Sequence, residues 1–206
     1  MRTLGGFRAA WDNPRSMDEH GIRAIAAENA ALQQRFFGEN APLLAEVGKR
    51  MAESLRAGGK ILAFGNGGSA ADAQHFAAEL VGRFTRERPG WAAMALTTDS
   101  SIMTAVGNDY GYDAVFRRQV EAHGRPGDVA LGISTSGRSP NVIEGLRVAR
   151  ERGLLTVGLT GGGGGRMGGM VHYLVDVPHH TTARIQEVHA VVVHVLCQVI
   201  EEAMPA

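Results

Sequence analysis

Apolar residues follow two different spacings along the chain, and the change between them falls near residue 58. Up to about residue 57 they recur every three or four positions, which predicts two helices joined near Pro42. Proline suits the first turn of the second helix, and Gly58-Gly59 is expected to end it. The two stripes are Ile22, Ile25, Ala26, Leu32, Phe36, Phe37, then Leu43, Leu44, Val47, Met51 and Leu55.

After Lys60 the pattern becomes a series of short apolar runs, each followed by a polar or glycine-rich loop. The runs cover residues 61–64, 91–96, 128–133, 154–159 and 171–177, and residues 182–204 predict a closing helix. Buried strands that alternate with helices indicate a parallel sheet covered on both faces. We expect an α/β fold, a three-layer α/β/α sandwich around a five-stranded parallel sheet, over residues 58–206. Residues 1–57 are expected to form an N-terminal helical arm that serves packing or oligomer contacts.

Composition limits the number of domains and argues against several classes of protein. The 206 residues suit one domain, or one domain with an added N-terminal element. Lysine plus arginine (21) equals aspartate plus glutamate (21), which argues against a nucleic-acid partner or an anionic lipid surface. The single cysteine, Cys197, excludes an intramolecular disulfide and a cysteine zinc cage. We find neither a membrane-length apolar run nor a secretory leader, and expect a cytoplasmic protein.

The loop after the third apolar run, Ser134–Pro140, predicts a phosphate site. Ser139 can cap the following helix, whose first turn accepts Pro140. The hydroxyls of Ser134, Thr135 and Ser136 stand beside unpaired backbone N–H groups and a positive dipole end, which together suit a phosphate monoester. A plain serine-rich cap is the alternative, but Ser139 alone would satisfy a cap.

A second candidate loop, Gly65–Ser69, follows the first apolar run. It matches neither a Walker loop nor a dinucleotide fingerprint. Glycine lets a ligand approach the backbone closely at Gly67 and Gly68, and Asn66 and Ser69 add side-chain hydrogen bonds. Taken alone, such a turn is weak evidence for a ligand.

Two helices carry candidate metal ligands. His75 and Glu79 lie four residues apart on one helical face. Gln186 and His194 lie eight apart, about 80° around the axis of the closing helix. Imidazole and carboxylate groups suit zinc, although glutamine is an unusual ligand. Each histidine could instead be an ordinary hydrogen-bonded helix residue, and for His75 alone that would be favoured; His194 stands in an apolar stretch, where a polar group needs a partner. His189, on the same helix, is a weaker candidate.

For two further segments, composition alone predicts the local structure. Residues 106–111, VGNDYG, predict a turn that carries Asn108 and Asp109. The glycine run 161–165 with Arg166 is either a mobile flap or a long turn, and the sequence does not separate these.

Taken together, the motifs resemble the sugar isomerase (SIS) domain and, within it, the phosphoheptose isomerases. The similarity runs from about residue 58 to 201. Its motifs are GNGGSAADAQHFAAEL at 65–80, VGNDYG at 106–111, ISTSGRSPN at 133–141 and RIQEVHAVVVH at 184–194. The resemblance implies a flavodoxin-like sheet, a homotetramer with active sites at subunit interfaces, and one zinc ion per subunit. It also implies isomerisation of sedoheptulose 7-phosphate to D-glycero-D-manno-heptose 7-phosphate, for the nucleotide-activated heptose of cell-surface sugars such as lipopolysaccharide.

The resemblance also assigns roles to residues. The implied metal ligands are His75, Glu79, Gln186 and His194, and the implied acid–base pair is Glu79 and His194. The expected substrate-binding residues are Asn66, Gly67, Gly68, Ser69, Glu79, Asn108, Asp109, Ser134, Thr135, Ser136, Ser139 and Gln186.

This chemistry suits the residues. Aldose–ketose isomerisation moves a proton between adjacent carbons through an enediol, so it needs a base, an acid and an electrophile. Glu79 would take the carbon-bound proton, His194 would shuttle protons at oxygen, and zinc would polarise the oxygens. A zinc-bound carboxylate is a weaker base. Either Glu79 leaves the metal during turnover, or zinc is partly structural or inhibitory.

Two other functions are weighed against the enzyme. A non-catalytic tetrameric SIS adaptor that binds a replication initiator protein resembles this chain around GNGGS and RIQE but lacks the second site histidine, so the four retained side chains favour the enzyme. A sugar-phosphate-sensing regulator usually adds a helix-turn-helix domain, and residues 1–57 show neither its turn nor a basic face.

Overall fold

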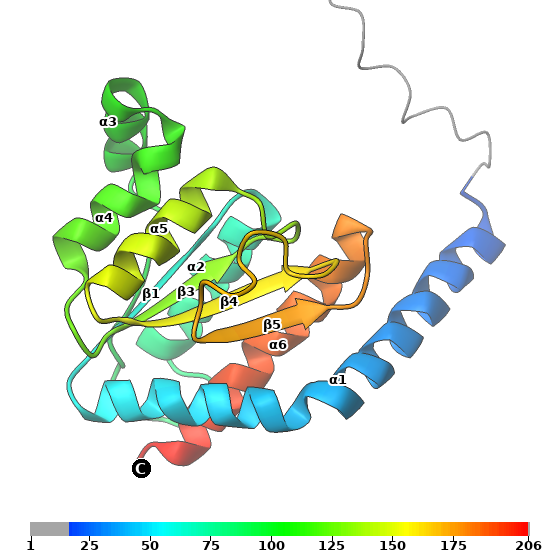
Figure 1. Ribbon diagram of the computed structural model, residues 1–206. Helices are drawn as coiled ribbons and strands as arrows, with labels where there is room; N and C mark the ends of the chain where they lie inside the picture. Colours follow the sequence, from blue (N-terminus) through cyan, green and yellow to red (C-terminus); the bar gives the residue numbers. More distant parts are fainter. Residues whose placement is uncertain (1–16, 206) are drawn as a thin grey trace, which may run out of the picture.

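A computed structural model describes residues 17–205 of the chain (Figure 1). The helices are α1 (Glu19–Arg56), α2 (Gly68–Val81), α3 (Ser100–Tyr110), α4 (Val115–His123), α5 (Pro140–Glu151) and α6 (Thr182–Ala203), with a short 3-10 turn at Tyr112–Ala114. The strands are β1 (Ile61–Gly65), β2 (Ala93–Ala95), β3 (Val129–Ile133), β4 (Leu155–Gly161) and β5 (Tyr173–Val177). Every predicted strand is present within a few residues of its expected position.

The sheet is parallel throughout, in the order β2-β1-β3-β4-β5. One apolar core joins the sheet to α1, α2 and α6, and a second joins the opposite face to α4 and α5. The predicted three-layer sandwich with a flavodoxin-like strand order is therefore confirmed. The chain direction across the sheet reverses between β1 and β3, and at such a switch point the loops beyond the carboxyl ends of the strands form the usual ligand site. Gly65 pairs with Ile133 in this register, so the two predicted ligand loops begin side by side.

The prediction of two N-terminal helices was wrong, because Pro42 lies inside one continuous helix, α1. Proline supplies no N–H to the Gly38 carbonyl, and Figure 1 shows the helix bending midway along its length. Burial continues on both sides of the proline, with Phe36 before it and Leu44 after it. Packing of both halves against the protein body compensates for the missing hydrogen bond. Gly58 follows the helix end with a positive φ, as expected.

Helix α6 is the central helix of its layer. By length and composition it is the one helix among the described residues that could cross a membrane. Its apolar face is instead buried in the protein, at Val188, Val192, Leu196 and Ile200, against the sheet layer and α1. The apolar character of α6 is thus explained by its place in the core.

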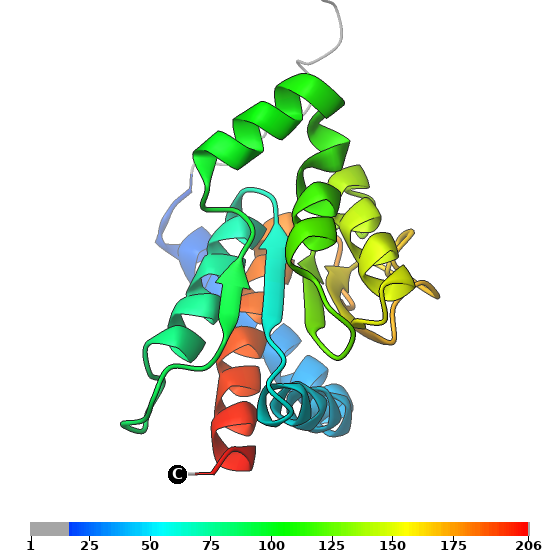
Figure 2. The ribbon, with the colours of Figure 1, turned by 90° about the vertical axis from the view of Figure 1, so that its left-hand side faces the viewer.

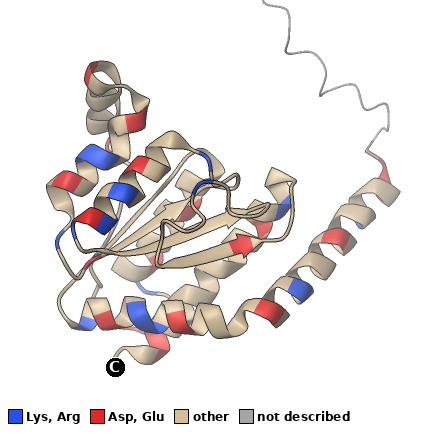
Figure 3. Ribbon diagram, in the orientation of Figure 1, with Lys and Arg blue, Asp and Glu red and all other residues tan. Residues whose placement is uncertain are grey.

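Charged residues are spread over the surface rather than segregated. Figure 3 shows acidic and basic positions interspersed along α1, α4 and α5. Many of them pair within one helix, as Arg117 does with Glu121 and Arg147 with Glu144 and Glu151. Positions of opposite charge therefore alternate along these helices rather than forming blocks of one sign.

Candidate active site

The loops after β1 and β3 form one cavity at the carboxyl edge of the sheet. Its volume is about 290 Å³. Asn66 and Asn141 join the two loops, since each side-chain amide nitrogen donates to the other's oxygen at 2.8–2.9 Å. The lining residues are Asn66, Gly67, Gly68, Ser69, Ile133, Ser134, Thr135, Ser139, Thr182 and Gln186. Most of the expected substrate-binding residues therefore meet in one place.

The serine-rich loop keeps its hydroxyls available for a ligand. Ser139 occupies the N-cap position of α5 and Pro140 its first turn, as predicted, but the Ser139 hydroxyl makes no capping hydrogen bond. It lies 2.9 Å from the Ser134 hydroxyl, which is only 4% exposed. Ser136 points elsewhere: its oxygen accepts a hydrogen bond from the Arg138 backbone N–H at 3.3 Å and does not line the cavity. Because the cap leaves these hydroxyls unused, the simple-cap explanation accounts for the loop poorly.

The glycine run at the end of β4, residues 161–165, is a turn fixed by hydrogen bonds that also holds the serine-rich loop, and we call it the clamp. Gly162 to Gly165 all have positive φ, which glycine adopts without strain. Asp176 on β5 accepts hydrogen bonds from the backbone N–H groups of Gly163 and Gly164, both at 3.1 Å. Beyond the run, the Arg166 N–H donates to the Gly137 carbonyl at 2.8 Å. The run is thus a turn held by hydrogen bonds at both ends.

A matched pair of glycine variants tests this clamp. A Cβ on Gly165 would lie 2.4 Å from the Ser136 carbonyl oxygen, whereas a Cβ on Gly163 would meet nothing within 4 Å. The φ of Gly165 is 53° and that of Gly163 is 92°, so alanine carries at least as much backbone strain at the control position, Gly163. We expect Gly165→Ala to weaken the affinity for a phosphate monoester about tenfold, and Gly163→Ala to change it little, by calorimetric titration. Equal affinities for the two variants would contradict the clamp.

His75, Glu79 and His194 form a compact cluster where α2 packs along α6. His75 Nε2 lies 3.0 Å from a Glu79 carboxylate oxygen and 3.3 Å from His194 Nε2. One ligand atom from each residue lies within 4.8 Å of the others. Donors placed tetrahedrally around zinc at 2.0–2.1 Å would be about 3.3 Å apart. Two imidazole nitrogens and a carboxylate oxygen at these separations fit zinc in both chemistry and spacing.

Gln186, the fourth predicted ligand, lies next to the loop cavity rather than in this cluster. A Cβ on Gly68 would be 2.4 Å from the Gln186 amide nitrogen, which explains the glycine at that position. Eight residues of α6 separate Gln186 from His194, about 12 Å along the helix axis. Three of the four predicted ligands therefore meet within the described residues, and the role of Gln186 at a metal stays a prediction.

The predicted turn at residues 106–111 was wrong, because Asn108 and Asp109 lie in the last turn of helix α3. Asp99 caps this helix by accepting a hydrogen bond from the Ile102 N–H at 2.9 Å, and Gly111, with a positive φ, ends it. Figure 2 shows α3 projecting from the body, and none of its residues is buried. The Asn108 amide donates to the Asp109 carboxylate at 2.8 Å, and neither residue lines the loop cavity of its own chain.

His189, the weaker candidate, is a core residue beneath the sheet edge. It is fully buried, and its Nε2 lies 3.0 Å from the Thr160 carbonyl oxygen. Burial lowers the pKa of this imidazole to about 4, partly opposed by that hydrogen bond. The ring is therefore neutral at pH 7 and, with Nε2 protonated, donates to the carbonyl. Among the residues that the structure describes, the His189 side chain makes no hydrogen bond to His75, Glu79 or His194.

The low pKa of His189 predicts a pH-dependent stability. Unfolding restores the ordinary pKa of 6.5, so between pH 6.5 and 4 the unfolded chain binds a proton that the folded chain does not. This residue should therefore lower the free energy of unfolding by about 3 kcal/mol as the pH falls through that range. Denaturant titrations of wild type and His189→Asn at several pH values measure the difference. Identical pH dependence in the two proteins would contradict the assignment.

A buried ion pair ties together the two helices of the cluster, and sequence reasoning missed it. Arg88 and Glu201 side chains are only 3% and 1% exposed, with Nε and Oε1 3.4 Å apart. Arg88 also donates to the backbone carbonyl of Glu79 at 2.8 Å, and its guanidinium stacks on Trp91. Burial alone would raise the pKa of Glu201, but hydrogen bonds from Thr85, Arg86 and Arg88 lower it below the ordinary value. No local motif marks this pair, because 113 residues separate its members.

The segment after α2, which contains Arg88, also covers His194. The Phe84 ring stacks on the His194 imidazole with 5.9 Å between centroids and 25° between planes. Glu201 accepts hydrogen bonds from the backbone N–H groups of Thr85 and Arg86, directly after Phe84. The buried carboxylate thus fixes both the end of α2 and the aromatic cover of the cluster.

Comparisons with a protein family, with known sequences and with solved structures all identify relatives of the same kind. The SIS domain family model matches residues 26–161. The chain is 56% identical over 173 residues to a phosphoheptose isomerase of Nitratidesulfovibrio vulgaris, covering 84% of this chain and 83% of that one. It is 51% identical over 181 residues to the phosphoheptose isomerase of Aquifex aeolicus, covering 88% and 95%. Solved phosphoheptose isomerases from Neisseria gonorrhoeae (47% identity, TM-score 0.84) and Francisella tularensis (36%, 0.86) each cover 89% of this chain, and 98% and 97% of their own.

Proposed function

Because the chain belongs to the SIS domain family and within it to the phosphoheptose isomerases, we propose that it converts sedoheptulose 7-phosphate to D-glycero-D-manno-heptose 7-phosphate through an enediol. It is an aldose–ketose isomerase. The observation that carries the mechanism is the pairing of Glu79 with two histidines, about 10 Å along α2 from the loop cavity and its hydroxyl groups. The alternative, a non-catalytic adaptor, is not supported, since relatives matched over most of their length are phosphoheptose isomerases.

The substrate is proposed to lie along α2. Ser134, Thr135 and Ser139 would hold the phosphate, with the backbone of Gly67 and Gly68 beside it. Seven residues of helix separate Gly68 from His75, about 10 Å along the axis. An open-chain seven-carbon sugar phosphate can span this separation, so its first two carbons would reach the cluster while Gln186 contacts the middle of the chain.

The proton transfers are assigned to Glu79 and His194. The Glu79 carboxylate removes a proton from C1 of the ketose while His194 protonates the C2 oxygen, which gives the enediol. Glu79 then returns its proton to C2, and His194 takes the proton from the C1 hydroxyl as the aldehyde forms. His75, 3.0 Å from Glu79, and Phe84, stacked on His194, would hold the pair in position.

We propose that His75, Glu79 and His194 hold one zinc ion per subunit. Gln186 is proposed as a fourth ligand, for which its amide would have to turn from the loop cavity toward the cluster. When bound, zinc supplies a Lewis acid that polarises a sugar oxygen. The support is the donor set and its spacing.

Zinc content tests each ligand separately. We expect His75→Ala to lower the zinc affinity more than a hundredfold, because it removes a direct imidazole ligand. Gln186→Ala should lower it less, because an amide oxygen is a weaker ligand than an imidazole. Competition with a chelator followed by metal analysis measures both. Unchanged affinity in Gln186→Ala would remove Gln186 from the ligand set without affecting the other three.

The assembly is proposed to be a homotetramer with active sites at subunit interfaces, in the cytoplasm. In support, α3 has no buried residue, and Tyr110 at its end and Tyr112 just after it are exposed. Asn108 and Asp109 would then contact the substrate from such an interface. Cys197 is a buried free thiol, and burial raises its pKa to about 12, so it stays protonated at pH 7. A chain with a single cysteine suits a reducing compartment. The division into an arm at 1–57 and a SIS domain at 58–206 stays a proposal.

Direct turnover tests the function. Wild type incubated with sedoheptulose 7-phosphate should form the aldose, followed by NMR, and His194→Gln should lower kcat about a hundredfold or more. Absence of product with the wild-type protein in the presence of zinc would contradict the proposed activity.

A further inference from the structure

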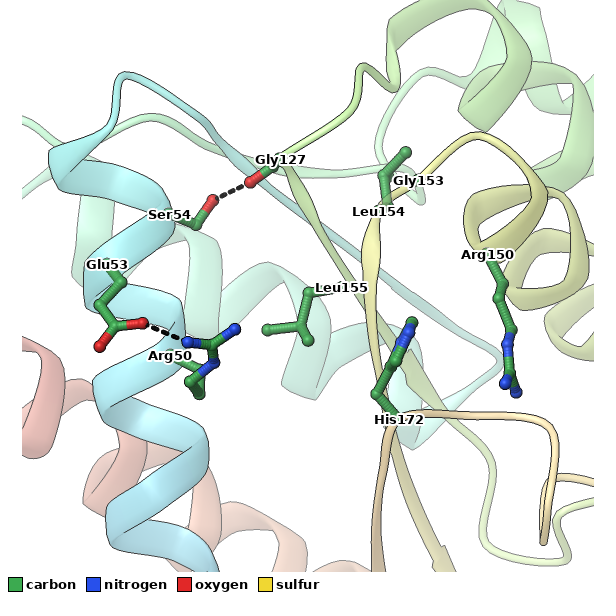
Figure 4. A pocket seen from close by; sticks show the side chains of 9 residues that line it. All are labelled: Arg50, Glu53, Ser54, Gly127, Arg150, Gly153, Leu154, Leu155 and His172. Atoms are coloured by element: carbon green, nitrogen blue, oxygen red, sulfur yellow. Dashed lines mark hydrogen bonds and ion pairs between the residues drawn. The ribbon is translucent and has the colours of Figure 1, made fainter.

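A second cavity opens at the opposite, amino edge of the sheet, between α1, α5 and the starts of β4 and β5 (Figure 4). Its volume is about 470 Å³, larger than the loop cavity. Arg50 on α1, Arg150 on α5 and His172 before β5 line it, and Leu155 lies between them. Strand β4 runs from this cavity toward the active-site edge, about 20 Å away along seven residues.

The polar groups of this cavity are mostly hydrogen-bond donors. The Thr156 backbone N–H donates to His172 Nδ1 at 3.0 Å, so the neutral ring carries its proton on Nε2. Burial and the nearby charge of Arg150 lower the pKa of His172, which favours this neutral donor form. Arg150 uses one nitrogen to donate to the Met170 carbonyl at 2.8 Å. Its remaining N–H groups stay available.

The charge around the cavity is not balanced. Two guanidinium groups line it against one carboxylate, Glu53, which pairs with Arg50 at 2.7 Å. Among the residues that the structure describes, no carboxylate lies within ion-pair distance of Arg150. Ser54 adds a hydroxyl, which donates to the Gly127 carbonyl at 2.6 Å and can still accept a hydrogen bond.

We propose that this cavity binds a small organic phosphate at a site separate from the substrate loop, with the phosphate between Arg150 and His172. A guanidinium fork and an imidazole N–H supply the donors that a phosphate prefers. Leu154 and Leu155 provide apolar contact for the carbon part, and the Arg50–Glu53 pair lies at the far side for hydroxyl or amino groups.

The test follows the His172 imidazole during titration with pyrophosphate, using protein labelled with ¹³C at histidine Cε1. The His172 resonance is identified by its loss in His172→Asn. Ser134→Ala is titrated in parallel, because pyrophosphate also suits the substrate loop. Sodium chloride at the same ionic strength controls for screening.

We expect a saturable shift of the His172 resonance in wild type and in Ser134→Ala with the same affinity. Arg150→Gln should weaken it about tenfold or more, since a charge-assisted hydrogen bond is lost. Arg147→Gln is the matched control, because it removes the same charge from an exposed position of the same helix, and its affinity should equal that of wild type. No saturable shift in wild type, or equal weakening by Arg147→Gln and Arg150→Gln, would overturn the proposal.

Discussion

Replacing Glu79 with glutamine is expected to lower kcat for sedoheptulose 7-phosphate about 10²–10⁴-fold, which is the usual contribution of a general base. Glutamine has nearly the same shape and can keep a hydrogen bond to His75, which lies 3.0 Å from the carboxylate. It cannot accept a proton at the pH of turnover. The fold and the affinity for phosphate should therefore stay close to those of wild type.

Glu87→Gln is the matched control for this variant. Glu87 lies in the loop after α2, is 90% exposed and pairs with Arg83 at 3.4 Å, so the same change there should leave kcat unaltered. Steady-state kinetics of both variants measure kcat, and thermal unfolding checks that the fold is preserved. A kcat for Glu79→Gln within a few-fold of wild type would show that Glu79 is not the base.

Replacing Glu201 with glutamine is expected to lower the free energy of unfolding by about 3–5 kcal/mol, because it leaves the Arg88 charge buried without its partner. The ion pair is almost completely excluded from solvent, and its carboxylate also accepts backbone hydrogen bonds from Thr85 and Arg86. Loosening the end of α2 and the Phe84 cover should also reduce kcat at temperatures where the variant is still folded.

Glu202, which follows Glu201 in α6, provides a control for this variant. Glu202 is exposed and contacts only Gln198 among the described hydrogen bonds, so Glu202→Gln should change the stability by less than about 0.5 kcal/mol. The double variant Arg88→Met, Glu201→Leu should be more stable than Glu201→Gln, since no charge is left buried. Equal denaturation midpoints for Glu201→Gln and Glu202→Gln would contradict the role of the pair.

The sheet could be predicted from the sequence because its strands are nearly continuous apolar runs that end in polar loops. The same regularity placed Asn66 and Ser134 at the carboxyl edge of the sheet, since the carboxyl ends of parallel strands meet at one edge, and the structure adds that β1 and β3 are neighbours there. Helical spacing likewise placed His75 and Glu79 on one face of α2, where they contact each other.

The features that could not be predicted depend on contacts between distant segments. Pro42 marks a helix start by local preference, but packing of both halves of α1 keeps the helix continuous. The segment that carries Asn108 has the composition of a turn, yet Asp99 and Gly111 cap it as a helix. The fixed conformation of the glycine run depends on Asp176, 11 or more residues away, and on the Gly137 carbonyl.

Exchange of solvent deuterium into the sugar tests the assignment of proton transfer to the α2–α6 pair most directly. In D₂O, wild type should place deuterium at C2 of the aldose product and at C1 of the recovered ketose, because the proton held by Glu79 can exchange with solvent. Glu79→Gln should show neither label over the same period. Incorporation by Glu79→Gln at the wild-type rate would mean that another group removes the C1 proton.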